Sequence, residues 1–327
     1  MNYEQTASAE PANVNNSGKA KFKIGFDVGG QSIKAGIVDD DFNIISKKIT
    51  VFSKEIGWKN TVKAMRQTAM EMIAENNLDG KNLSSLGIAT PGSVDVKNGV
   101  VIHAYNLDFH NVHITKEMSQ YFPGIPVTLI NDANAATFAE FKTGALKGYN
   151  NAILLTLGTG IGGGVILNGL LFNGGLGNGV ELGHVVLDMD GPLCTCGIRG
   201  CIEVFCTVRW FLQKGKPAGY TEVREIIDAA KRNEPAAALI FNEFVENLSS
   251  ALASLTNLLD PEIIALGGGI SLSGEILYHA LREKVEQKSF FRYPYKIVPA
   301  QLGNDAGMIG AALYSDFYGR PFDIHTV

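Results

Sequence analysis

Cysteine is scarce in this sequence. Four cysteines occur in 327 residues, and all of them lie between positions 194 and 206. They cannot form a disulfide framework spread over the fold, so metal binding in a reducing compartment fits better. No run of about eighteen apolar residues occurs, so no membrane-spanning helix is expected. The net charge of −5 leaves no basic excess for a general nucleic-acid or anionic-membrane surface.

The remaining composition, with 46% hydrophobic and 19% charged residues, is typical of a globular protein. Its length makes two domains a reasonable expectation. Residues 1–20 are rich in Asn, Ala, Ser and Glu and have neither an apolar core nor a basic leader. We therefore expect a disordered tail rather than a secretion signal, in a soluble cytoplasmic protein.

Hydrophobic periodicity predicts strands that alternate with helices, which is typical of an α/β fold. The predicted strands cover residues 21–30, 32–40, 43–52, 83–92, 124–132, 152–160, 162–169, 262–269 and 295–303. The predicted helices cover residues 60–76, 133–144, 222–230, 236–259, 274–286 and 305–318. Each half opens with a hairpin turned by glycines, which indicates an internal duplication and a cleft between two related domains.

The segment from Glu181 to Glu203 holds one histidine, His184, and the cysteines Cys194, Cys196 and Cys201. A Cys₃His set is typical of a closed tetrahedral zinc site. The alternative is a surface loop whose cysteines are free or paired, although Cys194 and Cys196 are too close in sequence to bridge easily. Glu181 and Glu203 flank the cluster as hydrogen-bond acceptors.

Three glycine-rich turns could bind phosphate or a nucleotide. The first joins the first two strands and contains Asp27, Gly29, Gly30, Gln31, Ser32 and Lys34. Its backbone N–H groups could hold phosphate and Asp27 could hold Mg²⁺ through water, but such a turn is also an ordinary hairpin. The second contains Gly158, Thr159, Gly160 and Gly162, and so many glycines weaken a strand, which favours phosphate binding. The third, Gly267, Gly268 and Gly269, could let an adenine lie close to the backbone, or could be a plain connection from a strand to a helix.

Asn131 and Asp132 end a buried strand and open a helix. Asp132 could simply be the N-cap of that helix. At the end of a strand in a cleft, it could instead accept the proton of a substrate hydroxyl that attacks a phosphate.

These motifs together resemble the ROK (repressor, open reading frame, kinase) family of sugar kinases. The matching segments are DVGGQSIK (27–34), GIATPG (87–92), INDANA (130–135), GTGIGGG (158–164), ELGH (181–184), CTCGIRGC with Ile-Glu (194–203) and GGGIS (267–271). The resemblance implies a two-domain actin/hexokinase-like ATPase fold built from duplicated ribonuclease-H-like domains. Residues 21–136 with about 313–327 would form the small domain, and residues 137–312 the large domain with the zinc loop.

The resemblance also implies the roles of individual residues. Asp132 would be the general base toward the 6-hydroxyl of a hexose. The sugar hydroxyls would be held by Asn131, Glu181, His184 and Glu203, with Asn106 and Gly92 as further candidates. Zinc would be bound by His184, Cys194, Cys196 and Cys201. ATP with Mg²⁺ would occupy the glycine turns.

Two positions depart from the family pattern, Gln31 in place of threonine and Cys206 in place of a small residue. The implied activity is phosphorylation of a hexose at its 6-hydroxyl, with glucose favoured and N-acetylmannosamine or another hexose as the alternative. A DNA-binding repressor fits less well, because no recognition helix is predicted before the first strand. A non-catalytic sugar sensor fits less well because Asp27, Asp132 and both glycine turns are present. The apolar segment 244–259 suggests a homodimer or homotetramer.

Overall fold

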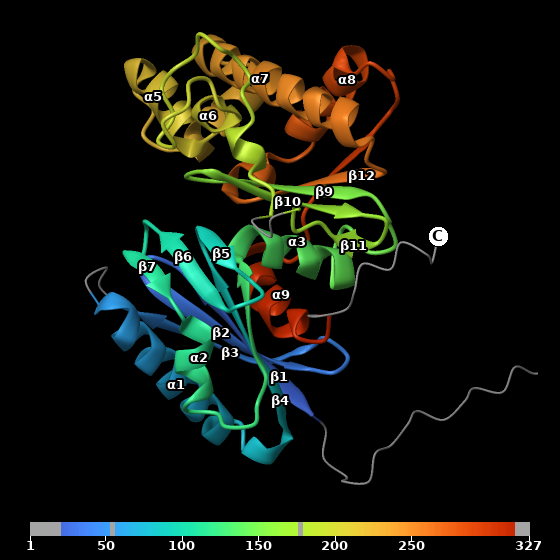
Figure 1. Cartoon of the computed structure of the whole chain (residues 1–327). Helices are drawn as coiled ribbons and strands as arrows, with labels where there is room; N and C mark the ends of the chain where they lie inside the picture. The colour runs from blue at the N-terminus through green and yellow to red at the C-terminus, as the bar shows by residue number, and fades with distance from the viewer. Residues whose placement is uncertain (1–20, 53–55, 176–178, 318–327) are drawn as a thin grey trace, which may run out of the picture.

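The computed structural model describes residues 21–52, 56–175 and 179–317 (Figure 1). The tail predicted at residues 1–20, and the C-terminal end of the small domain from residue 318 onward, lie outside the described residues. In the part that is described, no helix is both long enough and apolar enough to cross a bilayer.

The N-terminal half is built on a five-stranded sheet with the order β3-β2-β1-β4-β8. Its strands are β1 (Phe22–Val28), β2 (Ser32–Asp39), β3 (Ile44–Val51), β4 (Leu83–Thr90) and β8 (Val127–Asn131). β1, β2 and β3 are antiparallel neighbours, whereas β1, β4 and β8 run parallel. The parallel strands end at one edge of the sheet, so the residues that follow them lie close together.

The C-terminal half repeats this sheet, with the order β11-β10-β9-β12-β13. Its strands are β9 (Ala152–Leu157), β10 (Ile161–Leu167), β11 (Leu170–Leu171), β12 (Ile263–Gly267) and β13 (Lys296–Pro299). The first three strands are again antiparallel, and β9, β12 and β13 are again parallel. The predicted duplication and the α/β fold class are therefore confirmed.

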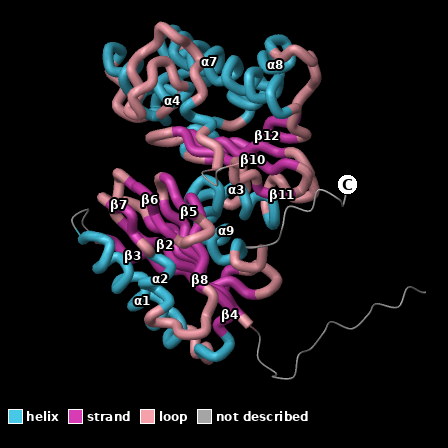
Figure 2. Tube along the Cα trace, viewed as in Figure 1, coloured by secondary structure: helices cyan, strands magenta, loops and turns pink. Residues whose placement is uncertain are grey.

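Helices form layers outside and between the two sheets (Figures 1 and 2). α1 (Gly57–Glu75) and α2 (Ile114–Ser119) lie below the N-terminal sheet, and α3 (Asp132–Thr143) and α9 (Ala306–Tyr314) lie between the sheets. The far side of the second sheet is covered by α4 (Ile202–Phe205), α5 (Val208–Gly215), α6 (Val223–Lys231), α7 (Pro235–Leu259) and α8 (Glu275–Lys288). Most of the apolar side chains of α7 are buried among these neighbours, so its hydrophobicity is explained within one chain.

α9 packs directly on the N-terminal sheet because glycines face it there. Gly25 pairs with Gly36 and with Gly87 in the strand register, which places three glycines in a row across the sheet. A Cβ on Gly87 would lie 1.7 Å from the Ala311 carbonyl oxygen, and one on Gly25 would lie 2.0 Å from the Met308 carbonyl oxygen. Any larger residue would push the helix off the sheet.

We propose to assign the whole of α9 to the N-terminal half, since it packs on β1 and β4. This moves the boundary expected near residue 313 to the turn before residue 306.

A three-stranded sheet of β5 (Ser93–Asp95), β6 (Val100–Ala104) and β7 (Phe109–Val112) was not predicted. α2 and α5 were also missed. These elements are short, so their periodicity is weak. The turn between β6 and β7 nevertheless carries Asn106 to the cleft.

Candidate active site

A cavity of about 480 Å³ lies between the two halves. Most of the predicted site residues line it, although they come from distant parts of the sequence. From the N-terminal half these are Asp27, Lys34, Gly92, Asn106, Asn131 and Asp132; from the C-terminal half they are Gly160, Gly162, Glu181, His184, Glu203 and Gly268. The fold therefore brings together the carboxylates, the histidine and parts of two glycine turns in one space.

The N-cap of α3 is Asn131 and not Asp132. The Asn131 side-chain oxygen accepts the N–H groups of Ala133 at 2.9 Å and Asn134 at 3.1 Å. Its amide nitrogen donates to the Gly92 carbonyl at 3.1 Å, which holds that turn against the cleft. Asn131 therefore caps the helix, and the Asp132 carboxylate accepts the N–H of Ala133 at 2.8 Å.

Asp132 is the most perturbed acid of the cleft. Burial raises its pKa to about 6, and the negative charges of Asp27 and Glu181 act in the same direction, against the hydrogen bond from Ala133. A carboxylate with a pKa near neutrality is still ionised at pH 7 and is a stronger base than an ordinary aspartate. The arrangement therefore supplies a proton acceptor at the end of a strand.

Asp27 and Lys34 face each other across the first hairpin and form an ion pair of 3.1 Å. The Lys34 ammonium also donates to the Asn304 carbonyl at 3.4 Å, which links the hairpin to the turn before α9. Gly30 lies close to the turn between β6 and β7, because a Cβ on Gly30 would lie 2.9 Å from the Asn106 carbonyl oxygen. The first turn thus helps to hold Asn106 in place, in addition to any contact with phosphate.

Glu203 connects the Cys-rich loop to the second glycine turn. One oxygen of Glu203 accepts the Ile161 N–H at 3.0 Å, and the other accepts the Cys194 thiol at 3.6 Å. A Cβ on Gly160 would lie 2.7 Å from the first of these oxygens. Glycine at 160 therefore allows Glu203 to reach the turn, and the Cys-rich loop and the turn are joined through one side chain.

His184, Cys194, Cys196 and Cys201 come together, with their ligand atoms within 4.8 Å of one another. His184 Nδ1 lies 3.7 Å from Cys194 Sγ, and the sulfurs of Cys196 and Cys201 are 3.6 Å apart. Tetrahedral zinc with bonds of about 2.3 Å separates two sulfurs by about 3.8 Å, so the donors fit this ion. Burial and the neighbouring sulfurs raise the pKa of the Cys201 thiol to about 12, which a bound cation would reverse.

Nδ1 of His184 faces the sulfurs, so its other ring nitrogen is free for a different partner. Glu181 lies on the same wall of the cleft. Desolvation raises the pKa of Glu181, His184 opposes this shift, and the nearby Glu203 adds to it. Two acceptors and a ring nitrogen therefore line one side of the cavity, a set that suits a ligand rich in hydroxyl groups.

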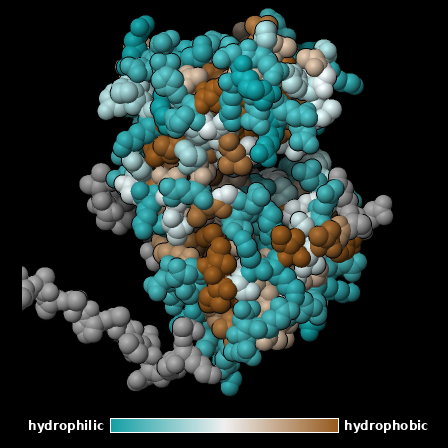
Figure 3. All heavy atoms as spheres, turned by 180° about the vertical axis from the view of Figure 1, so that it is seen from behind, coloured by the Kyte–Doolittle hydropathy of each residue, from teal (hydrophilic) through white to brown (hydrophobic). Residues whose placement is uncertain are grey.

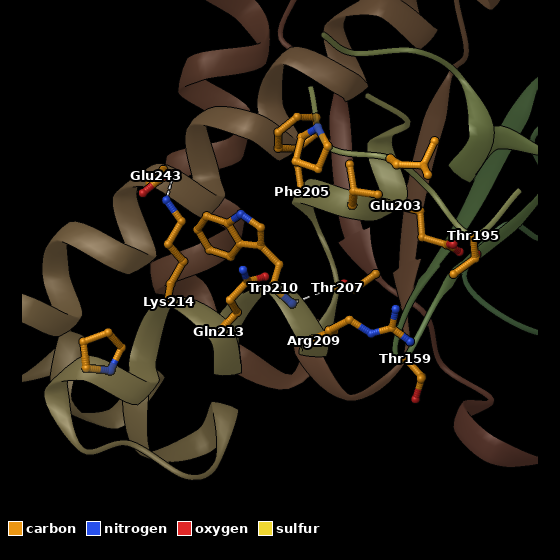
Figure 4. A pocket seen from close by; sticks show the side chains of 14 residues that line it. Thr159, Thr195, Glu203, Phe205, Thr207, Arg209, Trp210, Gln213, Lys214 and Glu243 are labelled. Atoms are coloured by element: carbon orange, nitrogen blue, oxygen red, sulfur yellow. Dashed lines mark hydrogen bonds and ion pairs between the residues drawn. The ribbon is translucent and has the colours of Figure 1, made fainter. Parts of the chain in front are cut away.

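Some predicted nucleotide-binding residues lie beside the cleft rather than in its wall. Thr159 lines an adjoining cavity of about 530 Å³ between the Cys-rich loop and α5, shown in Figure 4. Gly269 lines a third cavity, of about 650 Å³, with apolar side chains of α5 and α6. The walls of these cavities do not include Gly29, Gly30, Gln31, Ser32, Gly158 or Gly267. Gln31 is exposed, and the buried Cys206 packs in the core of the C-terminal half.

Thr156, Gly303 and Asn304 also line the cleft and were not predicted from the sequence. Gly303 and Asn304 follow β13, the strand that corresponds to β8 in the duplicated sheet. The duplication itself was therefore the signal that could have found them, because residues after corresponding strands meet at the same edge.

The model of the ROK family matches residues 23–316, so this chain belongs to the ROK family. It is 39% identical to the glucokinase of Thermotoga maritima, and the match covers 88% of this chain and 95% of that protein.

Solved structures agree with this assignment. The ROK hexokinase of Thermus thermophilus is similar with a TM-score of 0.79 and 32% identity, over 90% of this chain and 99% of that chain. The ROK family glucokinase of Streptomyces griseus, solved in complex with glucose and AMPPNP, has a TM-score of 0.74 and 32% identity, over 89% of this chain and 98% of that chain. The predicted actin/hexokinase-like fold is confirmed.

Proposed function

We propose that this protein transfers the γ-phosphoryl group of ATP to the 6-hydroxyl of a hexose, with glucose as the favoured substrate. The observation that carries the proposal is the Asp132 carboxylate in the cleft, which is relieved of helix capping by Asn131 and has its pKa raised to about 6. The similarity to proteins named glucokinase supports the choice of sugar.

In this proposal, Asp132 accepts the proton of the sugar hydroxyl as its oxygen attacks the γ-phosphorus. The other sugar hydroxyls bind to Glu181, the free ring nitrogen of His184, Glu203, Asn106 and Asn131. Closure of the two halves would exclude water, which otherwise competes as the acceptor of the phosphoryl group. General-base help of this kind contributes about 10²–10⁴-fold to the rate.

The nucleotide is assigned to the C-terminal half. Gly160 lines the cavity of about 480 Å³ to which the sugar is assigned, called the sugar cavity below. Thr159 lines the adjoining cavity beside α5. The adenine is assigned to the apolar cavity beside Gly269, whose walls include Val208, Leu212 and Ile270. This order places the γ-phosphate nearest to Asp132.

Two metals complete the proposal. Mg²⁺ would be held through water by Asp27 and would neutralise charge on the phosphates. Zn²⁺ would be held by His184, Cys194, Cys196 and Cys201, and would orient His184 and the Glu203 loop. Three thiolates persist in a reducing setting, so a cytoplasmic location belongs to the same proposal.

The predicted homodimer or homotetramer stays a prediction, which sedimentation velocity can check. The face seen in Figure 3 is mostly hydrophilic, with apolar residues in separate groups.

The decisive experiment measures ATP consumption with Mg²⁺ against glucose, mannose, fructose, allose, N-acetylglucosamine and N-acetylmannosamine, and locates the transferred phosphate by NMR. Glucose-dependent turnover with phosphate on the 6-oxygen would support the proposal. Preference for N-acetylmannosamine would change the substrate but keep the reaction. No turnover with any sugar, despite sugar-induced thermal stabilisation, would favour a sugar sensor.

A further inference from the structure

Arg209 lies in the first turn of α5, and this helix begins against the second glycine turn. The Val208 N–H donates to the Gly158 carbonyl at 2.9 Å, so the start of α5 is attached to the turn. Thr207 caps the helix by accepting the Trp210 N–H at 3.4 Å. The position of Arg209 relative to the turn is therefore fixed by hydrogen bonds on both sides of it.

The Arg209 side chain extends from α5 toward Thr159 (Figure 4). Both residues line the cavity of about 530 Å³ and a second one of about 520 Å³ that continues along α5. Within the described chain, the Arg209 guanidinium has no hydrogen bond or ion pair. The neighbouring Lys214, in contrast, is paired with Glu243 at 2.5 Å and lies over the Trp210 ring.

The two cavities beside Arg209 lie between the proposed sugar site and the proposed adenine site. Thr159 is adjacent to Gly160, which borders the sugar cavity. Val208 and Leu212 line both the cavity that contains Arg209 and the apolar cavity beside Gly269. A nucleotide that extends from Gly269 to Gly160 would therefore pass its phosphate chain beside Arg209.

The negative charge of the cleft favours a cation on the path of the phosphates. Asp27, Asp132, Glu181 and Glu203 all line the sugar cavity, and its one lysine, Lys34, is already paired with Asp27. A polyphosphate entering this space would be repelled by the carboxylates. An unpaired guanidinium can offset that repulsion and can bind two phosphate oxygens at once.

We propose that Arg209 binds the α- and β-phosphates of the nucleotide and is a determinant of the selectivity for nucleoside di- and triphosphates over nucleosides. This inference rests on the proposed function for the identity of the ligand. Arg209 is neither the proposed proton acceptor nor one of the proposed sugar-binding residues. Its replacement should therefore weaken nucleotide binding and leave sugar binding unchanged.

The test is calorimetric binding of ATP, ADP and adenosine, without sugar and at fixed Mg²⁺, to the wild type and to Arg209→Gln. We expect ADP and ATP to bind about 10–100-fold more weakly to the variant, the range for a lost hydrogen-bonded charge pair. Adenosine affinity should not change. Arg209→Lys should recover part of the loss, and Lys214→Gln, which removes a paired cation from the same cavity, should show little effect.

Unchanged ADP affinity in Arg209→Gln would overturn the proposal. An equal loss for ADP and adenosine would also overturn it, because the residue would then act on the fold or on the adenine. Circular dichroism spectra and melting temperatures of the variants exclude misfolding. In steady-state assays the KM for ATP should rise while the KM for the hexose stays constant. If the wild type binds ADP more tightly than Arg209→Gln does but phosphorylates no sugar, only the proposed function is refuted. If the wild type binds no nucleotide, the proposed function and the role of Arg209 are both refuted.

Discussion

Replacing Asp132 with asparagine should inactivate the protein and stabilise it at the same time. The carboxylate is buried near Asp27 and Glu181, and its pKa is raised from 3.8 to about 6. Such a shift means that the ionised form is less favourable in the folded protein than in the unfolded chain. Asparagine has nearly the same shape without the charge, so Asp132→Asn removes this unfavourable term together with the proton acceptor.

The shift of about two pKa units corresponds to about 3 kcal/mol when the group is fully ionised. Asp132 is also the first residue of α3, where a negative charge gains up to about 1 kcal/mol from the helix N-terminus. The expected net stabilisation is therefore about 2 kcal/mol above pH 7. It should shrink as the pH falls through about 6 and vanish below the unfolded pKa of 3.8, where both states are protonated.

Urea unfolding of the ligand-free wild type and of Asp132→Asn, at pH 8 and at pH 5, measures this difference. Asp41→Asn, an exposed position, is the control and should be neutral at both pH values. Turnover should fall about 10²–10⁴-fold while sugar binding persists. A destabilised variant, or a gain that does not depend on pH, would refute the electrostatic argument. Near-normal turnover would remove Asp132 from the mechanism.

Three further predictions follow from the same structure. Elemental analysis should find about one zinc per chain, and Cys196→Ser should lower metal content, melting temperature and sugar affinity; freshly purified protein without zinc would contradict the site. The ratio kcat/KM should fall as the pH is lowered through about 6, where Asp132 becomes protonated. Asp27→Asn removes a like charge and should lower the pKa of Asp132, measured by NMR titration of the ligand-free protein, where the proposed Mg²⁺ role of Asp27 does not interfere; an unchanged pKa would contradict the coupling. Gly87→Ala should lower the melting temperature or prevent folding, because its Cβ would meet the Ala311 carbonyl, whereas Gly80→Ala, with open space around it, should be tolerated.

The duplicated α/β fold and the cluster of one histidine and three cysteines could both be predicted from the sequence alone. The strand pattern and the repeated glycine hairpins predicted the duplicated α/β fold, because periodicity and turn chemistry are local properties of the chain. The spacing of His184 and the three cysteines predicted their cluster for the same reason, since all four lie within one short segment.

Tertiary structure decided which of two neighbouring residues, Asn131 or Asp132, caps α3, because the choice depends on side-chain direction and on the Gly92 carbonyl in the turn after β4. It also showed that Glu203 reaches the second glycine turn and that Arg209 stands beside Thr159. Both pairs are separated by more than forty residues in the sequence, so no local pattern can reveal them. Only the folding of the Cys-rich loop and α5 against the second sheet brings these groups together.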